Sequence, residues 1–273
     1  MSHPPDLLDP DRIRSRICAD VLQHIARLDV FTELNSTNSH LLGAPAPAPG
    51  NLTAALAEFQ HAGRGRRGRT WHMPPGSGIA LSAGWSFART PDDLPALSLA
   101  AGVVTRQAIE ALTGCAPVLK WPNDLVWNHR KLGGILVETV PRKSGACHVV
   151  VGIGLNISMD SENLDNVGEH PDSAIDLMRM TNTRPPPRND IAAGLIEGYF
   201  EMFRTFEESG FRPYHTPFRE ADYLRGRHVT VTDGPDRLSG TAEGVDSRGA
   251  LIVMKAGGTR RIVSGDVTAR LGP

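Results

Sequence analysis

Residues 63–69 are four arginines and three glycines, in a chain whose formal net charge is only -1. Arginine carries a planar fork of donors that suits carboxylate and phosphate oxygens. The glycines between them let the backbone bend and bring its own N–H groups near an anion. We therefore predict an anion-binding loop. A solvated basic loop and a single-strand nucleic-acid contact are the alternatives, and the absence of interleaved aromatic residues disfavours the second.

Two further segments place charge where an anion could meet this loop. In Lys120-Trp121-Pro122-Asn123-Asp124, the proline restricts the backbone and Asn-Asp favours a turn, so a lysine and a carboxylate share a stiff corner. This corner is either an ordinary turn with a surface ion pair or a place where Asp124 holds Mg²⁺ beside substrate phosphates. Lys131 precedes Gly133 and Gly134 and an apolar strand, and the glycines permit close approach of a ligand or another backbone.

Two weaker motifs are polar or glycine-rich. Gly152 and Gly154 lie inside an apolar strand that ends at Asn156, but a third glycine and a following helix are missing, which excludes a dinucleotide fingerprint. The two glycines indicate either close strand packing or a flat floor beneath a ligand. Residues 35–38 (Asn-Ser-Thr-Asn) offer donors and acceptors, or simply cap a helix containing residues 41–42.

Hydrophobic periodicity predicts the elements that must position these residues. Before about Leu224 the chain mixes helices and strands, which indicates α/β or α+β layers. After it, short strands separated by Asp-Gly and Gly-Gly turns predict a compact all-β module of about 45 residues. The elements predicted in the larger part are one helix over residues 13–28, an irregular loop at 44–50, strands at 79–87, 134–140 and 148–157, a helix over 97–112 ended by Gly114, and a helix capped by Asp190 and running to Phe206.

Composition narrows the class of protein. The chain has 273 residues, of which 40% are hydrophobic and 22% charged, which allows one large domain or one large and one small. Its near-zero net charge disfavours a general nucleic-acid coat protein. Three widely spaced cysteines, Cys18, Cys115 and Cys147, predict reduced thiols in a cytoplasmic protein. No secretory signal and no membrane-spanning run is recognised.

Taken in chain order, the motifs resemble the biotin protein ligases. The matching segments cover roughly residues 30 to 271, and the arginine tract together with Lys-Trp-Pro-Asn-Asp is the most specific part. The resemblance implies an α+β fold: a mixed sheet like that of the class II aminoacyl-tRNA synthetases, with helices on one side, over residues 1–224, and a small SH3-like β-barrel over 225–273. The matching motifs are 36–38, 60–71, 120–124, 131–138 and 152–156.

The reaction implied by the resemblance has two steps. Biotin's carboxylate attacks the α-phosphate of ATP, with Mg²⁺ as cofactor, and gives biotinyl-5′-AMP and pyrophosphate. A lysine of a biotin carboxyl carrier protein domain then takes the biotinyl group and releases AMP. The mixed anhydride must be kept from water, so the arginine loop is predicted to become ordered over the adenylate.

The resemblance also assigns roles to individual residues. The catalytic group comprises Lys131, Arg66, Lys120 and Asp124, with Asp124 as the Mg²⁺ ligand. The residues expected to bind biotin are Ser36, Thr37, Asn38, Gln60, Arg64, Gly65, Arg66, Lys131, Gly133, Gly152 and Gly154. Those expected to bind ATP or the adenylate are Arg64, Arg66, Arg67, Arg69, Trp71, Lys120, Asn123 and Asn156, with Trp71 stacking on adenine.

Rival functions belong to the same superfamily or to another class. A lipoate or octanoate ligase or transferase shares the implied fold, but Cys115 and Cys147 have no evident nucleophile setting. An inactive biotin sensor or a nucleic-acid protein is disfavoured by the complete set of lysines and arginines. Some family members carry a winged helix-turn-helix. About 30 residues precede residue 36 here, so we expect no sequence-specific DNA binding. We expect no membrane association and consider a homodimer possible. The segment 172–177 matches the family only loosely.

Overall fold

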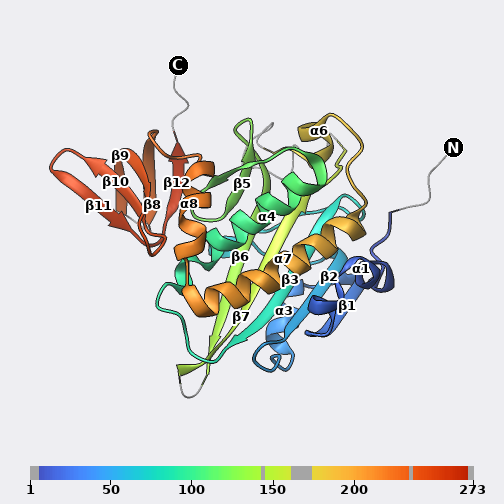
Figure 1. The fold of residues 1–273 in the computed structure, drawn as a ribbon. Helices are drawn as coiled ribbons and strands as arrows, with labels where there is room; N and C mark the ends of the chain where they lie inside the picture. Colours follow the sequence, from blue (N-terminus) through green and yellow to red (C-terminus); the bar gives the residue numbers. More distant parts are fainter. Residues whose placement is uncertain (1–5, 143–144, 161–173, 234–235, 270–273) are drawn as a thin grey trace.

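A seven-stranded mixed sheet forms the larger part of the molecule (Figure 1). The computed structural model describes residues 6–142, 145–160, 174–233 and 236–269. The strand order is β1-β2-β3-β7-β6-β5-β4, in which only the β1–β2 pair is parallel. The strands are β1 (Ile25–Leu34), β2 (Leu52–Gln60), β3 (Gly78–Phe87), β4 (Val118–Lys120), β5 (Asp124–Trp127), β6 (Arg130–Pro141) and β7 (Cys147–Asn156).

Long helices cover one face of this sheet, as Figure 1 shows. They are α4 (Leu97–Thr113), α7 (Arg188–Ser209) and α8 (Arg212–Ala221), preceded by the short turns η2 (Leu94–Ala96) and α6 (Leu177–Thr181). Trp85 of β3 stacks on Phe203 of α7 with ring centroids 5.4 Å apart, because alternate β3 residues point into this layer. The predicted end of α4 is confirmed: Gly114 caps it in the left-handed region, at φ 71°.

The other face of the sheet carries a short helix, α3 (Thr37–Gly43). Leu41 of α3 packs with Ala55 and Val150, whose chain neighbours point into the helical layer. The capping alternative for residues 35–38 is confirmed, since the Ser36 side chain accepts from the backbone N–H of Ser39. This helix places residues 36–38 above the centre of the sheet.

The C-terminal part is a five-stranded antiparallel sheet, which agrees with the small all-β module predicted. Its order is β11-β10-β9-β8-β12. Trp121 ties it to the main sheet by donating from its indole N–H to the carbonyl of Gly249 at 3.0 Å. The strands are β8 (His228–Asp233), β9 (Asp236–Val245), β10 (Leu251–Lys255), β11 (Gly258–Ile262) and β12 (Asp266–Ala269).

The prediction of one helix over residues 13–28 is wrong. Two short helices, α1 (Pro10–Arg16) and α2 (Ala19–Leu22), lead into strand β1. Ile25 and Leu28 are both buried although they lie three residues apart, because β1 has a register irregularity against β2 between Ile25 and Arg27. An extra residue in a strand changes which side chains point to the core. The apolar residues of this irregular strand therefore have a spacing that resembles that of a helix.

The start of α7 and the presence of strand β12 also differ from the predictions. Helix α7 begins at Arg188 after Pro187, so Asp190 lies in its first turn and is not the cap; there it pairs with Arg16 at 3.0 Å. Strand β12 was not predicted.

The 44–50 loop is irregular, as predicted. Residues 172 and 173 lie outside the described residues. No helix in the described chain is long and apolar enough to cross a membrane.

Candidate active site

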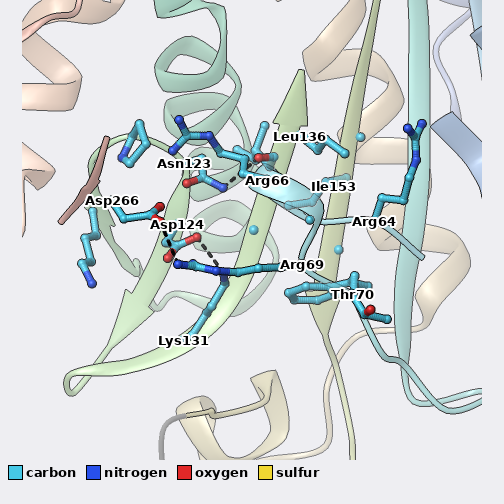
Figure 2. A pocket seen from close by; sticks show the side chains of 18 of the residues that line it. Arg64, Arg66, Arg69, Thr70, Asn123, Asp124, Lys131, Leu136, Ile153 and Asp266 are labelled. Atoms are coloured by element: carbon cyan, nitrogen blue, oxygen red, sulfur yellow. Dashed lines mark hydrogen bonds and ion pairs between the residues drawn. The ribbon is translucent and has the colours of Figure 1, made fainter. Parts of the chain in front are cut away.

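A cavity of about 730 Å³ lies between the main sheet and the C-terminal sheet, and the arginine loop forms part of its wall (Figure 2). It gathers motifs that are far apart in the sequence, and Figure 2 shows Asp124, Lys131, Arg69 and Asp266 together, away from Arg64. The predicted site residues that line it are Ser36, Thr37, Asn38, Gln60, Arg64, Gly65, Arg66, Arg69, Trp71, Lys120, Asn123, Asp124, Lys131, Gly152 and Gly154.

Neutral donors and acceptors form one part of the wall. Gln60 Oε1 accepts from the backbone N–H of Thr37 at 2.8 Å and lies 3.2 Å from its hydroxyl. The hydroxyl of Ser82 lies 2.7 Å from Thr37 Oγ1 and 2.5 Å from Asn38 Oδ1. Asn38 in turn donates to Glu138 Oε2 at 2.8 Å. These bonds fix the polar groups in place before any ligand arrives, which suits recognition of a small polar ring.

Lys131 and Asp124 form an ion pair in another part of the wall. Lys131 Nζ lies 2.7 Å from Asp124 Oδ1, and both side chains are partly exposed. The carboxylate on the Lys-Trp-Pro-Asn-Asp corner therefore meets Lys131 of β6. The same Nζ lies 5.7 Å from the centre of the Trp71 ring, within cation–π range. Asn123 braces the corner by donating to the Ile135 carbonyl at 2.9 Å.

The two glycines of β7 make room for side chains of the chain itself. A Cβ at Gly152 would lie 2.2 Å from Asn38 Oδ1, and a Cβ at Gly154 would lie 2.2 Å from Trp71 Cε2. Both approaches are far inside van der Waals contact. The glycines therefore let the Asn38 and Trp71 side chains approach β7 closely, which shapes the floor of the cavity.

The arginine loop (residues 63–71) folds as a tight turn. Its short helix η1 (Arg66–Gly68) contains Arg67 in the left-handed region at φ 55°, followed by Gly68 at φ 76°. The backbone N–H of Gly65 donates to the carbonyl of Arg69 at 2.7 Å, and that of Trp71 to Gly63 at 2.9 Å. Arginine side chains therefore leave the turn in different directions.

Those directions bring the arginines to different carboxylates. Arg64 donates to Glu138 at 2.7 Å, and Arg69 lies 2.8 Å from Asp266. Arg66 is half-buried, and its one hydrogen bond to a described residue is a long donation, 3.4 Å, to the carbonyl of Gly265. Burial lowers the pKa of Arg66, although Asp266 and Asp124 counteract the shift. Arg66 is thus a desolvated cation facing the cavity, which favours an anionic ligand there.

Three predicted site residues are not brought to the cavity wall. Arg67 points to the C-terminal sheet and lies 2.5 Å from Asp233. Asn156 is fully buried and donates to the Ile175 carbonyl at 3.1 Å, so it anchors the segment beyond β7. Gly133 is packed against β7, where a Cβ would lie 2.8 Å from the carbonyl oxygen of Gly154.

Sequence reasoning missed several residues that line the cavity. His129 and Tyr223 are joined by a 2.9 Å hydrogen bond between Nδ1 and the phenol oxygen. Burial raises the pKa of the Tyr223 phenol. Asp266 and Thr268 come from the unpredicted β12. No local pattern marks these residues, although His129, at φ 66° after Asn128, lies in a hairpin turn between two predicted segments.

The cavity offers few carboxylates to a divalent cation. In the described part of the chain, no group of three or more His, Cys, Asp or Glu is placed to hold a metal by itself. Asp124 nevertheless lines the cavity beside several cations. One or two carboxylates plus substrate phosphates are the usual surroundings of Mg²⁺, so Asp124 fits an ion that arrives with a nucleotide.

Comparison with known proteins places the chain in a class. Residues 30–156 match the model of the Biotin/lipoate A/B protein ligase family, and residues 225–270 match the Biotin protein ligase C terminal domain. The chain is 33% identical over 270 residues to the Bifunctional ligase/repressor BirA of Salmonella typhimurium, covering 99% of this chain and 81% of that protein. It is 32% identical to the Biotin--[acetyl-CoA-carboxylase] ligase of Mycobacterium tuberculosis, over 88% of each chain.

A solved structure agrees with these matches. The biotin protein ligase from Aquifex aeolicus in complex with biotin and ATP superimposes with a TM-score of 0.76 at 25% identity, covering 91% of this chain and all of that one. Fold, cavity and sequence together define a ligase. The chain belongs to the biotin protein ligase family.

Proposed function

We propose that this enzyme joins biotin to a lysine of a biotin carboxyl carrier protein domain at the expense of ATP. In the first step a biotin carboxylate oxygen bonds to the α-phosphorus of ATP, and the bond to the pyrophosphate leaving group breaks. In the second step the carrier lysine's amine attacks the biotinyl carbonyl carbon. The bond between the carbonyl carbon and the oxygen that bridges to phosphorus then breaks. AMP leaves with that oxygen, and the amine gives up a proton.

One observation carries the proposal: a single cavity joins a neutral polar pocket to a cationic wall. Thr37, Asn38 and Gln60 supply fixed donors and acceptors that match a ureido ring. Arg66, Lys120 and Lys131 line the same cavity. Two anions, a carboxylate and a triphosphate, repel each other, so preorganised cations are what this reaction needs most.

We assign roles by position along that wall. Lys131, held by Asp124 over Trp71, would contact biotin's carboxylate and later the activated carbonyl. Arg66 would meet the phosphates, and Lys120 would hold the leaving pyrophosphate. Asp124 would hold Mg²⁺, which when bound with ATP offsets phosphate charge. The arginine loop would keep water from the mixed anhydride.

The main rival is a ligase for lipoate or octanoate, because one family model covers both acids. The match of residues 225–270 to the biotin-type C-terminal domain favours biotin. So do two relatives of about one-third identity whose names specify biotin or BirA. Arg64, Arg66 and Lys131 are all present in the cavity, which disfavours an inactive sensor.

Several further features stay predictions. We keep a catalytic unit over residues 1–224 and a β unit over 225–273. Strands β1 and β4 form the two edges of the main sheet, and an open edge can pair with a second copy, so a homodimer stays possible. We also predict a cytoplasmic location and a carboxylase carrier domain as the partner. We predict no sequence-specific DNA binding, which a gel shift on operator-like DNA tests.

The decisive experiment incubates the protein with biotin, MgATP and a carrier domain, then measures biotin on the carrier by mass. We expect transfer that requires both biotin and ATP. Lipoic and octanoic acids in place of biotin test the rival. Absence of biotin transfer would overturn the proposed function, and transfer unaffected by Arg66→Gly and Lys131→Ala would overturn the assigned roles.

A further inference from the structure

The arginine loop is docked on the C-terminal sheet through charged contacts that the reaction itself does not explain. Arg67 lies 2.5 Å from Asp233, and Arg69 lies 2.8 Å from Asp266. Arg67 also donates to the Thr232 carbonyl at 3.4 Å and lies 3.8 Å from Asp266. Arg66 donates to the neighbouring Gly265 carbonyl. Three arginines of one short turn therefore contact the same surface.

That surface, which we call the docking face, consists of Thr232, Asp233, Ser264, Gly265 and Asp266. Its parts are fixed in position: Ser264 donates to Asp233 at 2.9 Å, and β12 pairs with β8 from Asp266 and Thr232 onward. Ser264 and Arg67 lower the pKa of Asp233, so this carboxylate is charged at neutral pH.

Gly265 shows that the docking face depends on a close backbone approach. Its φ is 152°, and a Cβ there would lie 2.7 Å from Val231. The glycine lets the chain bend so that its carbonyl faces Arg66 while the next residue, Asp266, faces Arg69. The chain at this point therefore presents two adjacent acceptors, a backbone carbonyl and a side-chain carboxylate, to two arginines of the loop.

We propose that Asp266 is a positioning residue for nucleotide binding: it docks the arginine loop on the C-terminal sheet and so presents Arg66 to the phosphates of ATP. Asp266 lines the cavity, and its carboxylate binds Arg69 rather than projecting unpaired toward an incoming anion. Arg66, three residues before Arg69 in the turn, is held half-buried, and its hydrogen bond within the described residues is a long one to Gly265. A cation kept desolvated in this way is ready for phosphate oxygens. Nucleotide binding in this account rests on the proposed function.

Asp233 provides an internal comparison. It holds Arg67, which does not line the cavity, and it is more exposed than Asp266, at 54% against 32%. Its loss should loosen the loop without removing a group from the cavity wall. Asp266→Asn should therefore have the larger effect on ATP, and Asp233→Asn a smaller effect of the same sign.

The test begins with the ligand-free full-length chain. Hydrogen exchange is measured at the amides of Gly65, Arg69 and Trp71, which are bonded within the loop. Asp266→Asn should speed this exchange about two- to fivefold, the range expected for losing one exposed ion pair. The matched control is Glu243→Gln, which removes one negative charge from an exposed position of β9 in the same sheet. Unchanged exchange in Asp266→Asn, or an equal change in the control, would overturn the docking role.

The second readout is biotinyl-AMP formation at varied ATP. Asp266→Asn should raise the KM for ATP about two- to fivefold, leave the KM for biotin and the rate at saturating ATP unchanged, and lose this difference in about 1 M salt. Asp266→Glu should recover part of the effect. Equal rises for ATP and biotin would indicate mere structural damage, and a lower KM for ATP would mean that Asp266 repels the nucleotide; either result overturns the proposal. If the unsubstituted enzyme forms no biotinyl-AMP, the proposed function fails and the exchange measurement still decides the docking role.

Discussion

Among the arginine–carboxylate pairs of the described residues, two networks lie in opposite surroundings. Arg188 donates to Glu58 at 2.8 Å, and their side chains are 3% and 9% exposed. Arg67 and Arg69 meet Asp233 and Asp266 with side chains between 32% and 55% exposed. The first network lies at the N-terminal end of α7, where Arg188 is the first residue, and the second borders the cavity.

The difference teaches what each network can do. A buried pair is hard to break because the charge left behind has no water. Glu58 also accepts from the Leu8 backbone N–H at 2.7 Å, so this network holds the N-terminal segment to α7 and β2. An exposed pair is worth little and exchanges partners easily. Arginines that must later bind phosphate therefore suit the second network.

The largest expected effect is on stability, at the buried network. Arg188→Met leaves Glu58 charged without its partner, and we expect the free energy of unfolding to fall by about 3–5 kcal/mol. Urea denaturation measures the change. The double substitution Arg188→Met with Glu58→Leu should recover much of the loss, because it removes the unpaired charge. A fall below about 1 kcal/mol in the single variant would mean that water reaches this pair.

Next comes catalysis at the cavity. Lys131→Ala should lower the rate of biotinyl-AMP formation about 100- to 1000-fold, the range seen when one preorganised transition-state donor is lost. Stability should change by less than about 1 kcal/mol, because the Lys131–Asp124 pair is partly exposed. Arg130→Ala, which removes the neighbouring exposed cation, is the matched control and should stay active. Equal losses in the two variants would contradict the role given to Lys131.

An effect of intermediate size is expected from a buried carboxyl group, Asp222, on the pH dependence of stability. Asp222 lies beside the linker to β8, and burial raises its pKa to about 6, although the backbone N–H groups of Leu224 and Arg225 and the charge of Arg225 act against the shift. A raised acid pKa means that the folded state holds its proton more tightly. The free energy of unfolding should therefore fall as pH rises from about 4 to about 6, by about 3 kcal/mol at most.

Asp222→Asn checks this sign, because the amide keeps the oxygen that accepts from Leu224. The variant should be more stable than the unsubstituted protein at pH 8 and nearly equal at pH 4, as measured by urea denaturation. A variant that is less stable at pH 8 would show that the charged carboxylate is favourably paired in the fold.

The smallest effect is expected at the exposed network. Arg67→Gln removes an exposed pair with Asp233 and should cost about 0.2–1 kcal/mol of stability. Thermal unfolding in low and high salt measures it, and the difference should vanish as salt screens the pair. A loss as large as that of Arg188→Met would erase the contrast between the two networks.

Much of the fold was predictable because it depends on local patterns. Runs of Val and Ile predicted β6 and β7, and Gly114 correctly ended α4. The first helix failed because the irregularity in β1 imitates helical spacing. The four-residue β12 was missed because so short a strand is defined by pairing with β8 and leaves little trace in its own sequence.

The candidate site likewise has a part that the sequence predicts and a part that only the tertiary fold defines. Residue types indicated which chemistry the arginines and lysines serve, and most of these residues line one cavity. Their partners were hidden, because Asp266 is 197 residues from Arg69 and acquires its place only through the tertiary fold. Spacing also predicted Lys120 as the neighbour of Asp124 across the corner, and the two residues are register partners in the β4–β5 pair. The approach of Lys131 from β6 to 2.7 Å was not predicted.

The central claim is that this cavity joins a carboxylate to the α-phosphate of ATP, and adenylate formation without any carrier tests it most directly. The protein is mixed with biotin and ATP labelled at the α-phosphate, and labelled biotinyl-5′-AMP is quantified in a single turnover. We predict stoichiometric adenylate that persists on the enzyme and is reduced about 100-fold or more in Lys131→Ala. No labelled adenylate from the unsubstituted enzyme, or equal adenylate from the Lys131 variant, would contradict this account.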